Sequence, residues 1–345
     1  MIIDHVRRTS ARRFFLALAV FLGSSPSSAQ SVLLGAGATF PEPLYTKWFA
    51  GFAEQHPEYR ILYESVGSEE GVRRLRDGAV DFAGSDMPLD ENQLANLGHP
   101  VLQLPSVIGA AVPIYHLEGV TQDLRLTPDT LAGIFLGRIK RWSDPAIQSV
   151  NRGIALPARE IVVVHRSDGS GTTFVWTDYL SKISPQWKST AGTGTSVEWP
   201  VGIGAAGNGG VAQRVRETPY SIGYVEFIYA LLNRLSYAAV RNAGGRYITA
   251  DLDSITAAAA NSAQQMPASF RLSITNATGR NSYPIASFTY LLVRVKTGDA
   301  AKDRFLRDLL QWILAAGQRQ AAGLGYGSLP PEIAARERRA IDSVY

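Results

Sequence analysis

Short runs of β-branched and apolar residues alternate with longer amphipathic stretches along most of this chain, a pattern typical of α/β proteins. Near its beginning, the runs at 31–34, 60–65 and 80–85 predict three strands, each followed by a turn that carries polar side chains. The stretch 44–55 predicts the first helix, because four aromatic residues share one face at i, i+3, i+4 and i+7. Ligands of open α/β sheets bind at the carboxyl ends of the strands, so we expect ligand-binding residues in the polar turns.

Two long apolar segments, 102–115 and 284–293, predict strands that carry the chain from one lobe to another and back. Between them the pattern predicts helices at 127–136, 174–180, 226–235 and from 211 and 252, with strands at 161–164 and 222–225. A wide apolar stripe predicts a last helix at 301–320. We therefore expect an α/β fold of two lobes, with residues 30–107 and 285–345 in lobe one and 108–284 in lobe two.

A glycine-rich turn follows the predicted strand 161–164, in the stretch Arg166-Ser167-Asp168-Gly169-Ser170-Gly171-Thr172-Thr173-Phe174. The first N–H groups of a helix lack partners and carry partial positive charge, so they are able to bind an anion. Gly169 and Gly171 allow backbone angles at which several amides converge. Together with the Arg166 guanidinium and the neighbouring hydroxyls, this turn predicts an oxyanion site.

The turns after the first three strands add further candidate ligands. Thr39 offers a hydroxyl and Phe40 an amide after Gly35-x-Gly37, which lacks the third glycine of a dinucleotide fingerprint and argues against a nucleotide cofactor. Ser68 is expected to be the N-cap of the next helix. Asp86 stands in a polar loop just before Met87-Pro88, and the residues alone leave open whether it is a ligand or a solvated side chain.

Residues 1–29 are predicted to be an export signal, read by the Sec or the Tat system. Four arginines precede a ten-residue apolar run, and small residues then place the cleavage site after Ala29. The apolar run is too short to span a bilayer, and the alternative is an uncleaved interfacial anchor. The predicted location is therefore the periplasm.

Charge and cysteine content narrow the function classes. Cleavage of the leader removes four arginines and one aspartate and lowers the net charge from +4 to +1, so no basic surface favours nucleic acid. The chain has no cysteine, which excludes disulfides, thiol nucleophiles and thiolate metal sites. We expect no cofactor and no metal.

These motifs resemble those of the periplasmic phosphate-binding proteins of the PstS type, in the same order and over nearly the whole chain after the leader. The stretches that carry the resemblance are Gly35-Ala36-Gly37-Ala38-Thr39-Phe40-Pro41, Gly67-Ser68, Asp81-Phe82-Ala83-Gly84-Ser85-Asp86, Leu136-Gly137-Arg138-Ile139-Lys140-Arg141-Trp142, Arg166-Ser167-Asp168-Gly169-Ser170-Gly171-Thr172, Gly192-Thr193-Gly194, Trp199-Pro200 and Ile222-Gly223-Tyr224-Val225-Glu226. The resemblance implies the two-lobed periplasmic-binding-protein fold of type II, with a mixed sheet flanked by helices in each lobe. It also implies a monomeric solute-binding protein that closes on inorganic phosphate and delivers it to a membrane-embedded phosphate ABC permease complex.

The resemblance further implies a role for individual residues. The ligands that it implies are Thr39, Phe40, Ser68, Asp86, Arg166, Ser170, Gly171 and Thr172, with Asp168 holding the arginine in position. In this set the threonines and serines supply hydroxyls, while Phe40, Ser68 and the turn after the arginine supply amides. The arginine supplies its guanidinium, and the aspartate at 86 supplies a carboxylate.

The chemistry of Asp86 indicates which oxyanion the site prefers. An ionised carboxylate can only accept a hydrogen bond, so it repels an anion unless that anion brings a hydrogen to share. Phosphate at neutral pH carries a hydrogen and sulfate does not, and a buried acceptor without a donor is penalised. The carboxylate therefore selects phosphate over sulfate, and hydrogen-bonding sites of this kind discriminate by about 10⁴–10⁵. With this reasoning the interpretation of Asp86 changes from loop residue to ligand.

Glu69 and Glu70 depart from the family pattern, in which small residues or glycine often follow the serine. Carboxylates in the first turn of a helix suit its dipole, although they also compete with a bound anion for it. We expect both side chains to face outward, which puts affinity in doubt but leaves the class of ligand unchanged.

Two other function classes stay open at this point. The first is a hydrolase of the phosphatase or serine type, with Ser170 as nucleophile and His165 or His116 as base, although the Gly-x-Ser-x-Gly motif is missing. The second keeps the binding fold and replaces phosphate by sulfate, molybdate or tungstate, which Asp86 disfavours. We expect no catalytic residue.

Overall fold

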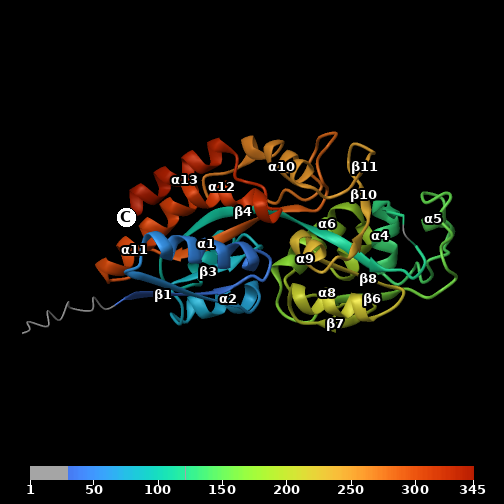
Figure 1. The fold of residues 1–345 in the computed structure, drawn as a ribbon, viewed down its shortest axis with the longest axis horizontal. Coiled ribbons are helices and arrows are strands. Elements are labelled where there is room, and N and C mark those ends of the chain that lie inside the picture. The colour runs from blue at the N-terminus through green and yellow to red at the C-terminus, as the bar shows by residue number, and fades with distance from the viewer. Residues whose placement is uncertain (1–29, 121) are drawn as a thin grey trace, which may run out of the picture.

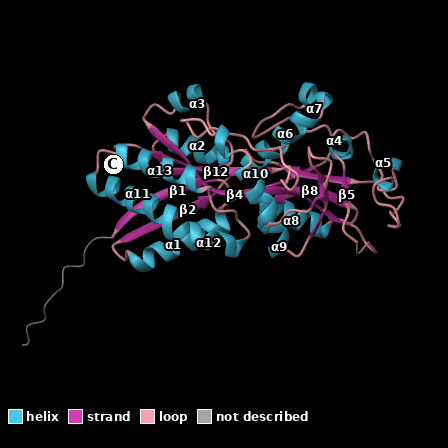
Figure 2. Ribbon diagram, turned by 90° about the horizontal axis from the view of Figure 1, so that it is seen from above, coloured by secondary structure: helices cyan, strands magenta, loops and turns pink. Residues whose placement is uncertain are grey.

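The computed structural model describes residues 30–120 and 122–345 of the chain, and the predicted export signal at 1–29 lies outside this part. Its largest sheet joins strands from the whole chain in the order β2-β1-β3-β12-β4-β8-β6-β7, with β9 paired to β4 as well. Elements from both ends of the chain form one half of the molecule and elements from its middle form the other (Figure 1). In each half, helices lie on both sides of the strands (Figure 2).

Lobe one is built on five strands. β1 (Ser31–Gly37) pairs in parallel with β2 (Tyr59–Ser65) and β3 (Phe82–Ser85), while β12 (Ala286–Arg294) runs antiparallel to β3 and β4. Gly37 is required here, because a Cβ at this residue would lie 2.1 Å from the carbonyl oxygen of Gly84 on β3. The close approach of β1 and β3 thus explains why residue 37 is a glycine, without any role in nucleotide binding.

The strand β4 (Val101–His116) connects the two lobes. Its residues up to Ala110 pair with β12, and from Ala111 onward it pairs with β8 (Ser221–Glu226), again antiparallel. Nearly all of its side chains are buried, which explains why a continuous apolar run in the sequence predicts it. The predicted lobe boundary at residue 108 lies close to this exchange of partners and stays a prediction.

The sheet of lobe two continues from β8 to β6 (Val162–Arg166) and β7 (Ile203–Ala205), which are parallel to one another. A separate small sheet joins three short strands, β5 (Arg125–Leu126), β10 (Ala239–Arg241) and β11 (Tyr247–Ile248). The strand β9 (Ser236–Tyr237) lies beside β4. Each lobe therefore contains a mixed or parallel sheet, and the predicted α/β fold of two lobes is confirmed.

The predicted helices are present in the predicted order, with some differences at their ends, whereas three short helices at 91–95, 145–148 and 185–190 were not predicted. Their bounds are α1 Glu42–Gln55, α2 Ser68–Arg76, α3 Glu91–Ala95, α4 Pro128–Phe135, α5 Pro145–Gln148, α6 Gly171–Ile183, α7 Pro185–Thr190, α8 Gly207–Glu217, α9 Phe227–Leu232 and α10 Leu252–Ala260. In the described ranges, none of the helices combines the length and the apolar composition that a bilayer-spanning segment requires. The helix expected from residue 211 begins four residues earlier, because the glycines at its start are themselves helical.

The C-terminal helices cover lobe one. The predicted helix at 301–320 is α11 (Ala300–Trp312), which continues through a π-helical stretch, Ile313–Gly317, into α12 (Gln318–Ala321). A further helix, α13 (Pro331–Val344), was not predicted from the sequence. Stacked rings join these helices to the sheet, since Phe305 of α11 lies 3.8 Å from Tyr59 of β2 between ring centroids.

Candidate functional site

The predicted ligand residues come together where strands of both lobes end. β1, β3 and β6 lead directly into Thr39, Asp86 and the glycine-rich turn, and α2 and α6 begin beside them. All eight predicted ligands are buried, and Thr39, with 8% of its surface exposed, is at the edge of the group. The polar turns that are far apart in the sequence therefore form one enclosed cluster.

Arg166 is the positive charge of this cluster, and Asp168 fixes its side chain. The guanidinium Nε donates to Asp168 Oδ1 at 2.7 Å and Nη2 donates to Oδ2 at 2.5 Å. Burial acts to raise the pKa of Asp168, but the bonds to Arg166 and its charge outweigh burial and hold this pKa below its usual range. The guanidinium has five N–H groups, so Nη1 and Nη2 keep hydrogens that form a pair of donors for an oxyanion.

The start of α6 supplies amides and a hydroxyl. Ser170 is the N-cap, and its Oγ accepts from the amide of Thr173 at 3.1 Å. The amide of Ser170 itself donates to the carbonyl oxygen of Thr195 at 2.8 Å, so the expectation that this amide binds the ligand is wrong and only its hydroxyl is left. The amides of Gly171 and Thr172 donate to no atom in residues 30–120 and 122–345. Both belong to the first turn of a helix, where an anion is favoured.

Ser68 is the first residue of α2 and not its N-cap, so this expectation was wrong. The N-cap is Gly67, which has φ 94° and would place a Cβ 2.8 Å from the carbonyl oxygen of Gly169. The close approach requires glycine, and it moves the helix start by one residue. Ser68 Oγ instead accepts from the amide of Asp86 at 3.3 Å, which leaves its hydrogen available to a ligand.

The two lobes are in direct contact at Gly171. A Cβ on this residue would lie 2.2 Å from Ser68 Oγ and 2.6 Å from Asp86 Oδ2. A second contact is the hydrogen bond from the amide of Glu69 to the carbonyl oxygen of Gly169, at 3.1 Å. The start of α6 therefore packs against α2 and the loop after β3 with no room for an additional methyl group.

Asp86 is the acceptor of the site. Its Oδ1 accepts from Thr289 Oγ1 at 2.7 Å, while Oδ2 has no hydrogen-bond partner within the described residues. Burial raises the pKa of Asp86 to about 7, although the bond from Thr289 and the charge of Arg166 both act to lower it. A buried oxygen of this kind demands a hydrogen, either its own or one that a ligand brings.

Thr39 and Phe40 are held from both lobes. The hydroxyl of Tyr229 donates to the carbonyl oxygen of Thr39 at 2.8 Å, and that of Tyr326 donates to the carbonyl oxygen of Phe40 at 2.6 Å. The Phe40 amide has no partner in the part of the chain that the structure describes. With the carbonyls paired, Thr39 presents its hydroxyl and Phe40 its amide as the groups left to bind a ligand.

Sequence reasoning missed two residues that touch the cluster. Thr289 lies in the apolar run of β12, and its polarity is the one local feature that sets it apart from its neighbours. This feature alone does not indicate a role in a binding site. Asn208 lies among glycines at the start of α8, where the pattern predicts only a helix start, and its Nδ2 donates to Thr39 Oγ1 and Thr172 Oγ1 at 2.8 and 3.1 Å. Both are completely buried.

The acidic pair Glu69 and Glu70 lies outside the enclosed cluster. Glu69 is exposed and accepts from Thr195 Oγ1 at 2.9 Å. Glu70 is paired with Arg73 and Arg74 on the same helix, at 2.7 and 2.8 Å. The carboxylates therefore point away from the buried donors, as expected from the sequence.

A hydrolytic centre at Ser170 finds no support in the geometry. The imidazole of His165 stacks on Trp199, with 4.7 Å between ring centroids, and its Nδ1 lies 3.0 Å from the carbonyl oxygen of Arg166. It makes no hydrogen bond with Ser170, and His116 is at the far end of β4. Neither of the two histidines named as candidate bases is therefore hydrogen-bonded to the proposed nucleophile.

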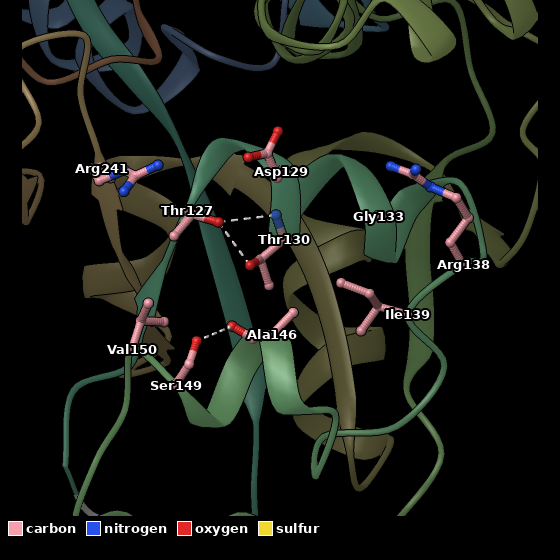
Figure 3. Close-up of a pocket in the computed structure, with 10 residues that line it drawn as sticks. All are labelled: Thr127, Asp129, Thr130, Gly133, Arg138, Ile139, Ala146, Ser149, Val150 and Arg241. Atoms are coloured by element: carbon pink, nitrogen blue, oxygen red, sulfur yellow. Dashed lines mark hydrogen bonds between the residues drawn. The ribbon is translucent and has the colours of Figure 1, made fainter.

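A surface pocket on lobe two is separate from the cluster (Figure 3). It is lined by residues of α4 together with Arg138 and Arg241, and none of the predicted ligand residues reaches it. Asp129 also lines this pocket, which therefore contains one negative side chain beside the two arginines. This pocket therefore lacks the converging donors of the buried site.

The buried cluster has the composition of a site for a dehydrated oxyanion. Its donors are one guanidinium, several hydroxyls and four amides, those of Phe40, Ser68, Gly171 and Thr172, which have no partner in the described ranges. Asp86 is the carboxylate that faces these donors. Groups of these types can donate to the oxygens of an anion, and the unpartnered carboxylate oxygen can accept one hydrogen.

Comparisons with known proteins show the family of this chain. Residues 24–316 match the family model described as the PBP superfamily domain. The phosphate-binding protein PstS of Xylella fastidiosa (strain 9a5c) is 44% identical over 315 residues, covering 90% of this chain and 86% of that protein. PstS of Pasteurella multocida (strain Pm70) is 40% identical and covers 93% of each chain. The crystal structure of a phosphate-binding protein from Stenotrophomonas maltophilia has the same fold, with a TM-score of 0.66 at 19% identity over 90% of this chain and 93% of that one. The chain therefore belongs to the PBP superfamily and, within it, to the PstS family of phosphate-binding proteins.

Proposed function

We propose that this protein captures inorganic phosphate between its two lobes and delivers it to the permease of a phosphate ABC transporter. The proposed ligands are the eight residues named from the sequence, with Ser170 contributing only its hydroxyl. Asp168 holds the guanidinium that binds the anion. Lobe one comprises residues 30–107 and 285–345, and lobe two comprises 108–284.

The observation that carries the proposal is the carboxylate of Asp86 among converging donors. Its Oδ2 is buried beside Ser68 and Gly171 and finds no protein hydrogen in the described residues. Monohydrogen phosphate supplies a hydrogen at this place and offers acceptor oxygens everywhere else. Sulfate, molybdate and tungstate bring no hydrogen at neutral pH, so they leave two negative oxygens facing each other.

The same site supports binding without chemistry. His165 is stacked on Trp199 and makes no hydrogen bond with Ser170, so the candidate serine and histidine do not form a catalytic pair. In the described ranges, no group of three or more acidic or histidine side chains is placed to hold a metal ion. We therefore propose a solute-binding protein and not a phosphatase.

The proposed location and partners follow from the predicted export signal and from the family. The leader at 1–29 directs the chain to the periplasm by the Sec or the Tat route, where the mature protein is proposed to be a monomer. Its proposed macromolecular partner is the membrane-embedded phosphate permease complex. Nothing in the charge of the mature chain favours a nucleic acid.

Equilibrium titration tests the proposal. The mature protein is titrated calorimetrically with phosphate, arsenate and sulfate at pH 8 and constant ionic strength. We expect tight binding of phosphate, binding of arsenate, because it also carries a hydrogen, and little or no binding of sulfate. Equal affinity for sulfate and phosphate would contradict the role of Asp86, and heat from sulfate alone would replace the proposed ligand.

A further inference from the structure

We propose that Asn208 is a positioning residue of the phosphate site, which turns the hydroxyls of Thr39 and Thr172 so that both donate to the bound anion. The inference rests on the proposed function and adds a residue to it that the motifs do not assign. Asn208 does not need to touch the anion itself. It acts through the two hydroxyls that it contacts.

The contacts of Asn208 define the direction of its side-chain amide. Its Oδ1 accepts from the backbone amide of Glu226 at 2.9 Å, and its Nδ2 donates to Thr39 Oγ1 at 2.8 Å and to Thr172 Oγ1 at 3.1 Å. A backbone N–H can only donate, so the oxygen of the side chain has to face Glu226. Both hydrogens of the Nδ2 group are then directed at the two threonine hydroxyls.

Each hydroxyl oxygen receives a second donor as well. The backbone amide of Asn208 lies 3.4 Å from Thr39 Oγ1, and Arg166 Nη1 lies 3.5 Å from Thr172 Oγ1. A hydroxyl has two acceptor positions and one hydrogen. When donors occupy both acceptor positions of a hydroxyl, only its own hydrogen is available to a ligand. Neither threonine hydroxyl donates to an acceptor among the described residues, so both hydrogens are available.

Asn208 orients hydroxyls that belong to both lobes. Asn208 and Thr172 belong to α8 and α6 of lobe two, whereas Thr39 follows β1 of lobe one. One fully buried side chain therefore bridges the cleft. The hydroxyl of Thr39 receives its fixed direction from Asn208 only when the lobes are together.

A consequence for specificity follows from the fixed hydroxyls. A threonine hydroxyl that is free to turn can accept a hydrogen from a ligand, and would make room for dihydrogen phosphate. With both hydroxyls held as donors, neither threonine accepts a hydrogen from the ligand. Asn208 thereby disfavours an anion that carries a second hydrogen next to Thr39 or Thr172.

A double-mutant cycle tests the inference, with inorganic phosphate as the probe in calorimetric titration at pH 8. Asn208→Asp keeps the size of the side chain and its bond with Glu226, but its carboxylate accepts hydrogens from the threonines and turns them away from the anion. Replacing both threonines by valine is expected to weaken phosphate binding by about 10- to 100-fold per hydroxyl in the otherwise unchanged protein. In the Asn208→Asp protein the same replacement is expected to change affinity by less than about fivefold, because those hydroxyls no longer bind phosphate. The added negative charge is present in both arms of that comparison and cancels.

The same cycle with Asn208→Ala, which adds no charge, keeps the test available if the aspartate variant folds poorly, and melting followed by circular dichroism without phosphate reports folding. A structural role alone predicts additive effects, in which the threonine replacements cost the same with or without Asn208. Additivity in these cycles would overturn the inference, while the proposed function would stand as long as the unchanged protein binds phosphate. Failure of the unchanged protein to bind phosphate would instead refute the proposed function.

Discussion

Sulfate binding by this protein is expected to weaken as the pH rises, whereas phosphate binding is not. The reason lies in the hydrogen that has to lie between Asp86 and the anion. Monohydrogen phosphate brings this hydrogen with it, so its binding above neutral pH takes up no proton from solution. Sulfate brings none, so it binds only to the protein in which Asp86 is itself protonated.

The magnitude follows from the environment of Asp86. Burial raises the pKa of this carboxyl to about 7. Below this value most molecules carry the proton, so sulfate affinity depends little on pH. Above it, binding requires the uptake of one proton, and linkage makes the affinity fall by about tenfold for each pH unit. Because about half of the molecules carry the proton at pH 7, sulfate affinity is expected to fall by about 50-fold between pH 7 and pH 9, and the preference for phosphate over sulfate to grow accordingly.

Calorimetric titration with each anion at pH 6, 7, 8 and 9, at constant ionic strength, measures this dependence. Asp86→Asn is the matched variant, because its amide keeps the size of the side chain and supplies a hydrogen at every pH. Its sulfate affinity should be independent of pH, and its preference for phosphate should be much smaller than that of the unchanged protein at pH 9. Sulfate affinity of the unchanged protein that stays constant from pH 7 to 9, with phosphate still bound, would refute the reasoning.

Three further changes test other parts of the site. Gly171→Ala inserts a methyl group 2.2 Å from Ser68 Oγ. Overpacking of this kind costs about 1–3 kcal/mol, so phosphate affinity should fall by about 5- to 150-fold. The melting temperature of the ligand-free protein should not fall. Gly209→Ala is its control, since the nearest atom to a Cβ there is 4.0 Å away, and equal titrations for the two variants would contradict contact between the lobes at Gly171. Thr289→Val removes a hydrogen bond that lowers the pKa of Asp86, so the pH at which sulfate affinity begins to fall should move upward; an unchanged onset in the titration series would argue against this bond. Arg166→Ala removes the buried guanidinium and should weaken phosphate binding by at least about 100-fold with the fold retained by circular dichroism; unchanged affinity would exclude Arg166 from the site.

The elements that the sequence predicts well are those in which the hydrophobic pattern has a single explanation. β4 is buried on both faces over most of its length, so its sequence is a continuous apolar run. Such a run predicts a strand without any knowledge of the neighbouring elements. α13 was missed although its pattern is amphipathic, because its charged residues are closely spaced and its apolar face is narrow. The N-cap of α2 was misplaced for a different reason. Gly67 was selected there by the close approach of Gly169 from the other lobe, and a local pattern contains no information on such a contact.

The residues of the candidate site likewise fall into two groups, those that the local sequence predicts and those that only tertiary contacts reveal. Residues in glycine-rich turns after strands, such as Arg166 and Ser170, carry a local signal for anion binding. Thr289 and Asn208 carry none, because each acts on a residue that is distant in the sequence, Asp86 in one case and Thr39 in the other. The fate of the Ser170 amide was likewise decided by Thr195, which the chain brings back from 25 residues further along. Sequence patterns therefore identify groups that can bind the anion, and tertiary contacts decide which of them are free to do so.

The charges of the candidate site do not favour an anion by net attraction. The buried Arg166 is neutralised by two hydrogen bonds to the partly exposed Asp168, and an ionised Asp86 would leave the cluster with a negative charge in excess. An anion can still bind there, because amides and hydroxyls whose direction is fixed interact strongly in a buried site of low dielectric constant. These dipoles carry no net charge, so they hold a phosphate without attracting every other anion to the same degree. In the proposed site, selection then depends on one carboxylate, and the contact between the lobes at Gly171 brings dipoles of both lobes close to the same ion.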